Sequence, residues 1–191
     1  MQTVVLAAGQ GTRMRPLTDT TPKPMLPAVG RPLLEHTLNR AADAGASRFI
    51  VVVGYESQQV REHFGDNRAG LDIAYAEQTD QRGTADAVRA AAPHLDDDAF
   101  VVLNGDALYD PASLATLYES GPAVGSYRVD NPSNYGVLQL DGERRHASHG
   151  RRRKAGRPGL EPHQYRLVRL PRVGDRLPRR IDLRTRRTGA D

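Results

Sequence analysis

The chain has 191 residues, which is enough for one domain and hardly for two. Hydrophobic residues make up 38% and can form a core, and no cysteine occurs, so disulfides, thiolate metal sites and a cysteine nucleophile are excluded. No stretch approaches the ~20 consecutive apolar residues of a membrane span, and the apolar run near the start is too short for a signal peptide. We therefore expect a cytoplasmic protein with no membrane partner.

Charge is divided unevenly along the chain. The formal net charge is +4, but residues 1–143 carry 11 Lys and Arg against 19 Asp and Glu, whereas residues 144–191 carry 16 against 4. The two net charges are therefore −8 and +12. The basic excess that would suggest a nucleic-acid partner belongs to the terminal segment alone. We expect one domain in residues 1–143 and a distinct Arg-rich tail in residues 144–191.

Hydrophobic patterns in the first 143 residues alternate between strands and helices. Short apolar runs such as 49–53 are typical of strands buried on both faces, and apolar residues spaced by three or four indicate helices. Strands are predicted at 2–8, 49–53, 71–77, 99–103, 123–129 and 136–140, and helices at 32–44, 60–64, 83–92 and 110–119. This order predicts an α/β fold with a mostly parallel sheet, whose carboxyl-end loops form the site.

A glycine-containing loop follows the first predicted strand, with the sequence Gly9-Gln10-Gly11-Thr12-Arg13. Two glycines let the backbone approach a ligand, the amides can hold phosphate oxygens, and Arg13 adds a permanent charge. The loop is not a dinucleotide fingerprint, because Met14 stands in place of the third glycine, and it is not a P-loop. On these residues alone, a phosphate site and a plain tight turn are equally good interpretations.

Lys23 lies between Pro22 and Pro24. Proline fixes φ and reduces the entropy that a loop loses on ordering, so this lysine is held in place by its neighbours. A cation positioned in this way fits a phosphate group. The alternative is an ordinary solvated loop lysine, which is the better interpretation of most single lysines.

Asp106 follows the buried strand at 99–103, directly after Asn104 and Gly105. In a parallel sheet this is the edge where ligands bind, and a carboxylate there can hold Mg²⁺ against substrate phosphates. The alternative interpretation is that Asp106 caps the next turn and has no ligand. No metal-ligand spacing occurs among the histidines, and no Ser/His/Asp grouping indicates covalent catalysis.

Together these motifs resemble a known family, the sugar-1-phosphate nucleotidyltransferases or NDP-sugar pyrophosphorylases. The resemblance covers residues 1–143. Within the family, this sequence is most similar to archaeal-type UDP-N-acetylglucosamine pyrophosphorylases and to glucose-1-phosphate thymidylyl- or uridylyltransferases. The matching segments are Leu6-Ala7-Ala8-Gly9-x-Gly11-Thr12-Arg13-x-x-Pro16-Leu17-Thr18, Pro22-Lys23-Pro24-Met25-Leu26-Pro27, Arg31-Pro32-Leu33-Leu34, Gln78 with Gly83-Thr84-Ala85, and Asn104-Gly105-Asp106.

The resemblance implies a Rossmann-like, GT-A-like three-layer fold and an enzyme that is often a homo-oligomer. It implies a Mg²⁺-dependent reaction in which UTP or dTTP reacts with a sugar-1-phosphate to give an NDP-sugar and pyrophosphate. The implied catalytic residues are Arg13 on the leaving pyrophosphate, Lys23 on the reacting phosphates and Asp106 on the metal. The implied nucleotide-binding residues are Leu6, Ala7, Ala8, Gly9, Gly11, Thr12, Gln78, Gly83, Thr84 and Gly105, and the implied sugar-binding residues are Tyr135 and Gly136.

The Arg-rich tail lacks motifs that the resemblance requires, namely a Glu-Lys-Pro lysine for the sugar phosphate, an Asn-x-Gly segment and a second metal ligand. A shift of one nucleotide lets the codons for residues 153–166 spell Glu-Lys-Pro-Ala-Asp-Pro-Ala-Ser-Asn-Leu-Ile-Asn-Thr-Gly, and the next codons permit Ser-Phe-Ala-Phe. Two missing motifs therefore return in family order. We hypothesise that residues 144–191 are read out of frame and are largely disordered.

Two other interpretations stay open. The tail could be a genuine Arg-rich arm that binds nucleic acid, which we consider the weaker hypothesis, and salt-dependent RNA binding would favour it. The chain could also be a catalytically dead nucleotide-binding regulator, and NTP binding without turnover would favour that. With the tail as written, we expect weak or no transferase activity.

Overall fold

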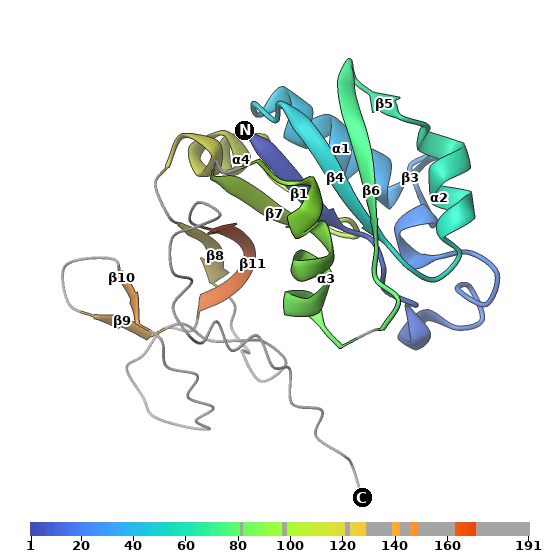
Figure 1. Cartoon of the computed structure of the whole chain (residues 1–191). Helices are drawn as coiled ribbons and strands as arrows, with labels where there is room; N and C mark the ends of the chain where they lie inside the picture. Colours follow the sequence, from blue (N-terminus) through green and yellow to red (C-terminus); the bar gives the residue numbers. More distant parts are fainter. Residues whose placement is uncertain are drawn as a thin grey trace, which may run out of the picture.

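The computed structural model describes residues 1–80, 82–96, 99–120 and 123–128, and beyond them the strands at 139–141, 146–148 and 163–170. Its main feature is a seven-stranded sheet (Figure 1). The strand order is β5 (Asn67–Arg68), β6 (Leu71–Glu77), β4 (Arg48–Val53), β1 (Gln2–Leu6), β7 (Phe100–Asn104), β11 (His163–Leu170) and β8 (Val124–Arg128). The α/β fold with a mostly parallel central sheet is thereby confirmed.

Four neighbouring strands, β6, β4, β1 and β7, run parallel and form the core of the sheet. Their apolar runs are buried on both faces: Val4 packs on one side of the sheet and Val5 on the other. The helices α1 (Leu33–Asp43), α2 (Ser57–Phe64) and α4 (Pro111–Glu119) cover one face, and α3 (Thr84–Ala91) covers the other (Figure 1). The result is a three-layer arrangement.

Three helix ends lie where local sequence signals indicated, whereas α2 begins at Ser57, three residues before the predicted start. Asp110 caps α4, because its carboxylate accepts a hydrogen bond from the backbone amide of Ser113 at 2.8 Å. After α1, Gly45 adopts a φ of 109°, a conformation open to glycine, and its amide bonds the carbonyl of Ala42. At Pro93, α3 gives way to a short 3₁₀ turn, η3 (Ala92–His94).

Short elements in the long first loop and after α2 were not predicted. They are the 3₁₀ turns η1 (Thr12–Met14) and η2 (Lys23–Met25), the hairpin of β2 (Pro27–Ala28) and β3 (Arg31–Pro32), and the edge strand β5. Each has two or three residues, which is too short for a hydrophobic period to be visible. The first strand ends at Leu6 and not at residue 8.

Two short parts of the Arg-rich tail, residues 146–148 and 163–170, are among the described residues, and the expectation that the tail is largely disordered stays a prediction. A hairpin forms between β9 (Gln139–Asp141) and β10 (His146–Ser148), and β11 lies antiparallel between β7 and β8. The reason is local composition: β11 contains Tyr165, Leu167, Val168 and Leu170, which favour strands despite the arginines between them. Among the described residues, no helix is long and apolar enough to cross a membrane.

Candidate active site

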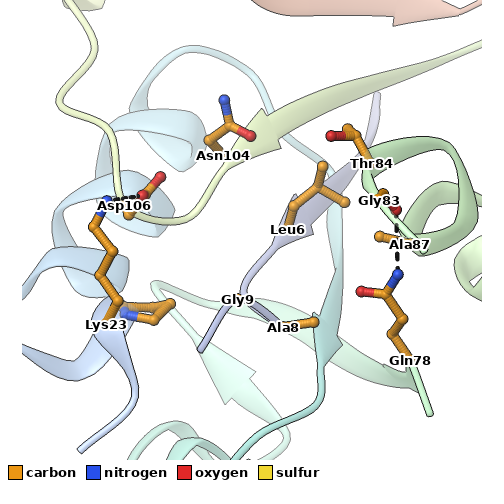
Figure 2. Close-up of a pocket in the computed structure, with 11 residues that line it drawn as sticks. Leu6, Ala8, Gly9, Lys23, Gln78, Gly83, Thr84, Ala87, Asn104 and Asp106 are labelled. Atoms are coloured by element: carbon orange, nitrogen blue, oxygen red, sulfur yellow. Dashed lines mark hydrogen bonds and ion pairs between the residues drawn. The ribbon is translucent and has the colours of Figure 1, made fainter. Parts of the chain in front are cut away.

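A cleft with a cavity of about 280 Å³ opens at the carboxyl ends of β1 and β7, beside the start of α3. Figure 2 shows Lys23 and Asp106 on one side of the cleft, Gln78 and Gly83 on the other, and the end of β1 between them. The lining residues are Leu6, Ala8, Gly9, Lys23, Pro24, Gln78, Gly83, Thr84, Ala87, Asn104 and Asp106. This is the edge at which parallel α/β sheets bind ligands.

The glycine loop packs directly against the loop that carries Lys23. Gly11 has a φ of 64°, and a Cβ there would lie 2.9 Å from the Cβ of Lys23 and 2.9 Å from the Cγ2 of Thr18. The Thr18 hydroxyl donates to the Gly11 carbonyl at 2.9 Å. Only glycine meets both requirements, the left-handed backbone and the close approach, so the two loops can pack this closely only with glycine at position 11.

Lys23 and Asp106 form an ion pair across one end of the cleft, with 2.5 Å between Nζ and Oδ2. Lys23 begins η2, where its carbonyl accepts the amide of Leu26. Asp106 is fixed from the other side, because the preceding Gly105 donates its amide to the carbonyl of Leu6 at 2.9 Å. The side chains are 31% and 23% exposed, so both charges are open to a ligand in the cleft.

The opposite end of the cleft holds the carboxamide of Gln78, which is only 8% exposed. Its Nε2 donates to the carbonyl of Gly83 and to Oδ2 of Asp86, both at 3.2 Å. Its backbone amide donates to the carbonyl of Val53 at 2.8 Å, which keeps Gln78 in line with β4. Gly83, with a φ of 109°, turns the chain into α3.

A divalent cation fits the Asp106 end of the cleft. The carboxylate already faces a cation, the ammonium group of Lys23, and its remaining exposure leaves room for water. Mg²⁺ is commonly held by one or two carboxylates together with substrate phosphates and waters, so one aspartate is sufficient. Within the described residues, no group of three or more His, Cys, Asp or Glu side chains forms a complete protein site for a metal.

Many of the residues expected in the site meet in this cleft, but several do not line it. Leu6, Ala8, Gly9, Lys23, Gln78, Gly83, Thr84 and Asp106 all line the cavity. Ala7 faces the hydrophobic core instead, because alternate residues of a strand and its extension point to opposite faces. Gly11 and Gly105 act through backbone geometry. Thr12 and Arg13 lie in η1 outside the cavity lining.

Tyr135 and Gly136, the expected sugar-binding residues, lie outside the described residues. Three lining residues were missing from the expected site: Pro24, Ala87 and Asn104. Ala87 lies three residues after Thr84 on α3, and helical periodicity could have indicated it. Asn104 is the last residue of β7, and its place at the carboxyl end of a parallel strand could have indicated it. The binding and catalytic roles of all these residues stay predictions.

The fold and the cleft define an α/β protein with a ligand-binding site at the carboxyl ends of its parallel strands. A glycine loop, a lysine and a carboxylate meet in that cleft. Residues 2–149 match the sequence model of the family described as Nucleotidyl transferase, and the chain belongs to this family.

Related proteins agree with this membership. The chain is 39% identical over 140 residues to the bifunctional protein GlmU of Methanococcus maripaludis, covering 73% of this chain and 33% of that protein. It is 43% identical over 110 residues to the UTP–glucose-1-phosphate uridylyltransferase AglF of Haloferax volcanii, covering 58% of this chain and 45% of that protein. The chain thus spans less than half the length of these curated relatives.

The fold is also similar to solved structures. The crystal structure of an apo UDP-glucose pyrophosphorylase superposes with a TM-score of 0.72 at 21% identity, covering 89% of this chain and 76% of that one. At this identity the similarity establishes the fold alone.

Proposed function

We propose that the cleft binds a nucleoside triphosphate with Mg²⁺, and that the complete protein transfers the nucleotidyl group to a sugar-1-phosphate with release of pyrophosphate. The observation that carries the proposal is the Lys23–Asp106 pair beside the glycine loop. It provides one charge for phosphate and one for a cation within a single cleft. The relatives named as GlmU and AglF support the choice of reaction.

In the proposed reaction, an oxygen of the sugar-1-phosphate attacks the α-phosphorus of the NTP, the bond to the β-phosphate oxygen breaks, and pyrophosphate leaves. Lys23 would contact the reacting phosphates and balance the charge that develops on them. Asp106 would hold Mg²⁺, which supplies further charge neutralisation when bound. The backbone of the glycine loop and Thr84 would orient the nucleotide, so that catalysis rests on positioning.

We further propose that the part of the protein that binds the sugar-1-phosphate is encoded, from about residue 144 onward, in a reading frame shifted by one nucleotide. Two missing motifs return together when the codons are shifted by one nucleotide. Resequencing the gene around the codons for residues 142–153 tests it directly, and an unshifted sequence would refute it.

The proposed function is tested by nucleotide binding and pyrophosphate release with the full chain. Calorimetry with UTP, dTTP, GTP, CTP or ATP and Mg²⁺ measures binding, and a coupled assay with glucose-1-phosphate or N-acetylglucosamine-1-phosphate measures transfer. Lys23→Met should weaken NTP binding by about tenfold to a hundredfold, because a charge-assisted contact is lost. Binding without turnover, in the frame-restored protein as well, would indicate a nucleotide-binding regulator instead.

Arg61→Met is the matched control for the loss of a cation. Arg61 lies on α2 and stacks on the ring of Tyr75, with 4.8 Å from its Cζ to the ring centroid, away from the residues that line the cleft. Its loss should leave NTP binding unchanged. Equal effects of the two substitutions would mean that Lys23 is not a phosphate ligand.

A further inference from the structure

We propose that Asp86 is a positioning residue that sets which bases the cleft accepts, because it fixes the orientation of the Gln78 carboxamide. The inference rests on the proposed binding of a nucleotide in this cleft. In this arrangement Gln78 presents only a hydrogen-bond acceptor to the base. The nucleotide must therefore carry a ring N–H, as uracil, thymine and guanine do, whereas cytosine and adenine do not.

The orientation of the carboxamide follows from its two partners. Nε2 of Gln78 has two hydrogens, and two acceptors face it: the carbonyl of Gly83 and Oδ2 of Asp86, each at 3.2 Å. Both donor positions are thus used within the protein, and Oε1 is left for a ligand. In Figure 2 this oxygen points away from Gly83 and toward the side of the cleft where Ala8 lies.

Asp86 makes the opposite orientation unfavourable. A flipped carboxamide would place Oε1 against a carboxylate and a carbonyl, neither of which can donate a hydrogen bond. With Gln78 only 8% exposed, water could not easily relieve that contact. Asp86 itself forms an ion pair with Arg89, which lies 3.6 Å away on the next turn of α3. Asp86 also lies in the first turn of that helix, where a negative charge is favoured.

The consequence is that Gln78 would select nucleotides by the hydrogen-bonding groups on the edge of the base, and not by the size of the base. An acceptor at Oε1 pairs with N3–H of uracil or thymine, or with N1–H of guanine. Cytosine N3 and adenine N1 carry lone pairs, so these bases would bring two acceptors together and leave Oε1 unpaired in a buried place. A buried polar group without a partner costs enough to produce discrimination on the order of tenfold to a hundredfold.

The test compares dissociation constants of the full 191-residue chain for UTP, CTP and N3-methyl-UTP, each with Mg²⁺. We expect UTP to bind about tenfold to a hundredfold more tightly than the other two. N3-methyl-UTP keeps the uracil ring and both carbonyls but lacks the N–H, so it isolates the acceptor at Gln78. Equal affinity of the unmodified chain for all three nucleotides would overturn the proposal without any mutant.

Substitutions at position 86 then separate positioning from structure. Asp86→Ala removes one partner and should reduce the UTP-to-CTP preference by about tenfold, because the carboxamide can now rotate. Asp86→Asn offers an N–H that can pair with a flipped Oε1, so it should also lower the preference, by less than Asp86→Ala, because it can still accept from Nε2. Asp80→Ala is the matched control: it removes a nearby exposed carboxylate that pairs with Arg82, and it should leave the preference unchanged.

The outcomes distinguish this inference from the proposed function. If no nucleotide binds, the proposed function fails. If nucleotides bind and Lys23→Met weakens them, but the preference is unchanged in Asp86→Ala, only the role of Asp86 is refuted. An affinity lowered equally for UTP and CTP in Asp86→Ala would also refute positioning and indicate a structural role for the carboxylate.

Discussion

The two long edges of β7 are built differently. On one side β7 pairs in parallel with β1, and that half of the sheet continues through β4 and β6 in regular βα units. On the other side it pairs antiparallel with β11, which comes from the Arg-rich tail and carries β8 at its far edge (Figure 1). Every described residue that lines the cleft comes from residues 6–106, within or beside the parallel half.

This difference separates the proposed nucleotide site from the proposed sugar site along the chain. The proposed nucleotide site depends on short-range loops at the ends of β1 and β7 and on the start of α3. The proposed sugar site depends on Tyr135 and Gly136 and on sequence from about residue 144 onward, where the reading frame is in question. A defect in the tail should therefore reduce transfer far more than it reduces nucleotide binding.

The largest expected effect comes from restoring the reading frame. A gene corrected by one nucleotide should encode a protein that releases pyrophosphate at least about 10³-fold faster than the 191-residue chain, because the sugar-phosphate lysine and the Asn-x-Gly segment return. UTP affinity should change much less. Pyrophosphate release and calorimetry on both proteins measure the two quantities. Equal turnover would show that the tail as written supplies the missing groups.

The next effect is expected at the metal end of the cleft. In the frame-restored protein, Asp106→Asn should lower turnover by about 10² to 10³-fold, since a neutral amide holds Mg²⁺ poorly. NTP binding measured with EDTA present should be nearly intact, because the loop contacts survive. Turnover equal to that of the unmodified protein would remove Asp106 from the metal role.

A smaller effect tests how tightly the glycine loop is coupled to Lys23. Gly11→Ala should lower the free energy of unfolding by about 2 to 4 kcal/mol, because the methyl group adds a clash with Lys23 and Thr18 to the strain of a positive φ. Gly30→Ala supplies the control, since Gly30 has a φ of 76° but nothing within 4 Å of the added methyl. Urea denaturation compares them, and equal losses would mean that the contact is not tight.

The smallest effect concerns a buried tyrosine that joins the parallel half to α4. Burial raises the pKa of Tyr118 to about 12 from its ordinary value of 10.0, and its hydroxyl lies 2.5 Å from that of Thr3. The unfolded chain releases this proton near pH 10 and the folded chain only near pH 12. The stabilisation is thus present below pH 10 and is lost as the pH rises to 12, by about 2 kcal/mol.

Urea denaturation across pH 9 to 12 measures this loss, with Tyr118→Phe as the reference that removes only the ionising hydroxyl. The unmodified chain should lose more stability than the variant over that interval. Parallel curves would show that Tyr118 does not keep its raised pKa in the folded protein.

Regular elements with clear local signals could be predicted from the sequence. The strand β6 has the expected bounds, and α4 begins at the predicted Asp110–Pro111 cap. The contents of the cleft could be predicted in part, because glycines, Lys23 and Asp106 lie at the ends of predicted elements. Contacts between distant residues could not: nothing local indicates that Lys23 and Asp106, or Gln78 and Asp86, are paired. The strand β11 was missed because an Arg-rich average hid a short run of strand-forming residues.

The position of β11 also has a consequence for synthesis. The ribosome completes β8 well before it reaches His163–Leu170, yet β8 joins the sheet through β11. During that interval the nascent chain carries two strands, β7 and β8, whose facing edges have no partner between them. Exposed strand edges of this kind pair readily with other chains. Translation that pauses or stops ahead of His163 thus leaves an aggregation-prone intermediate, because β11 is the strand that fills the gap between β7 and β8.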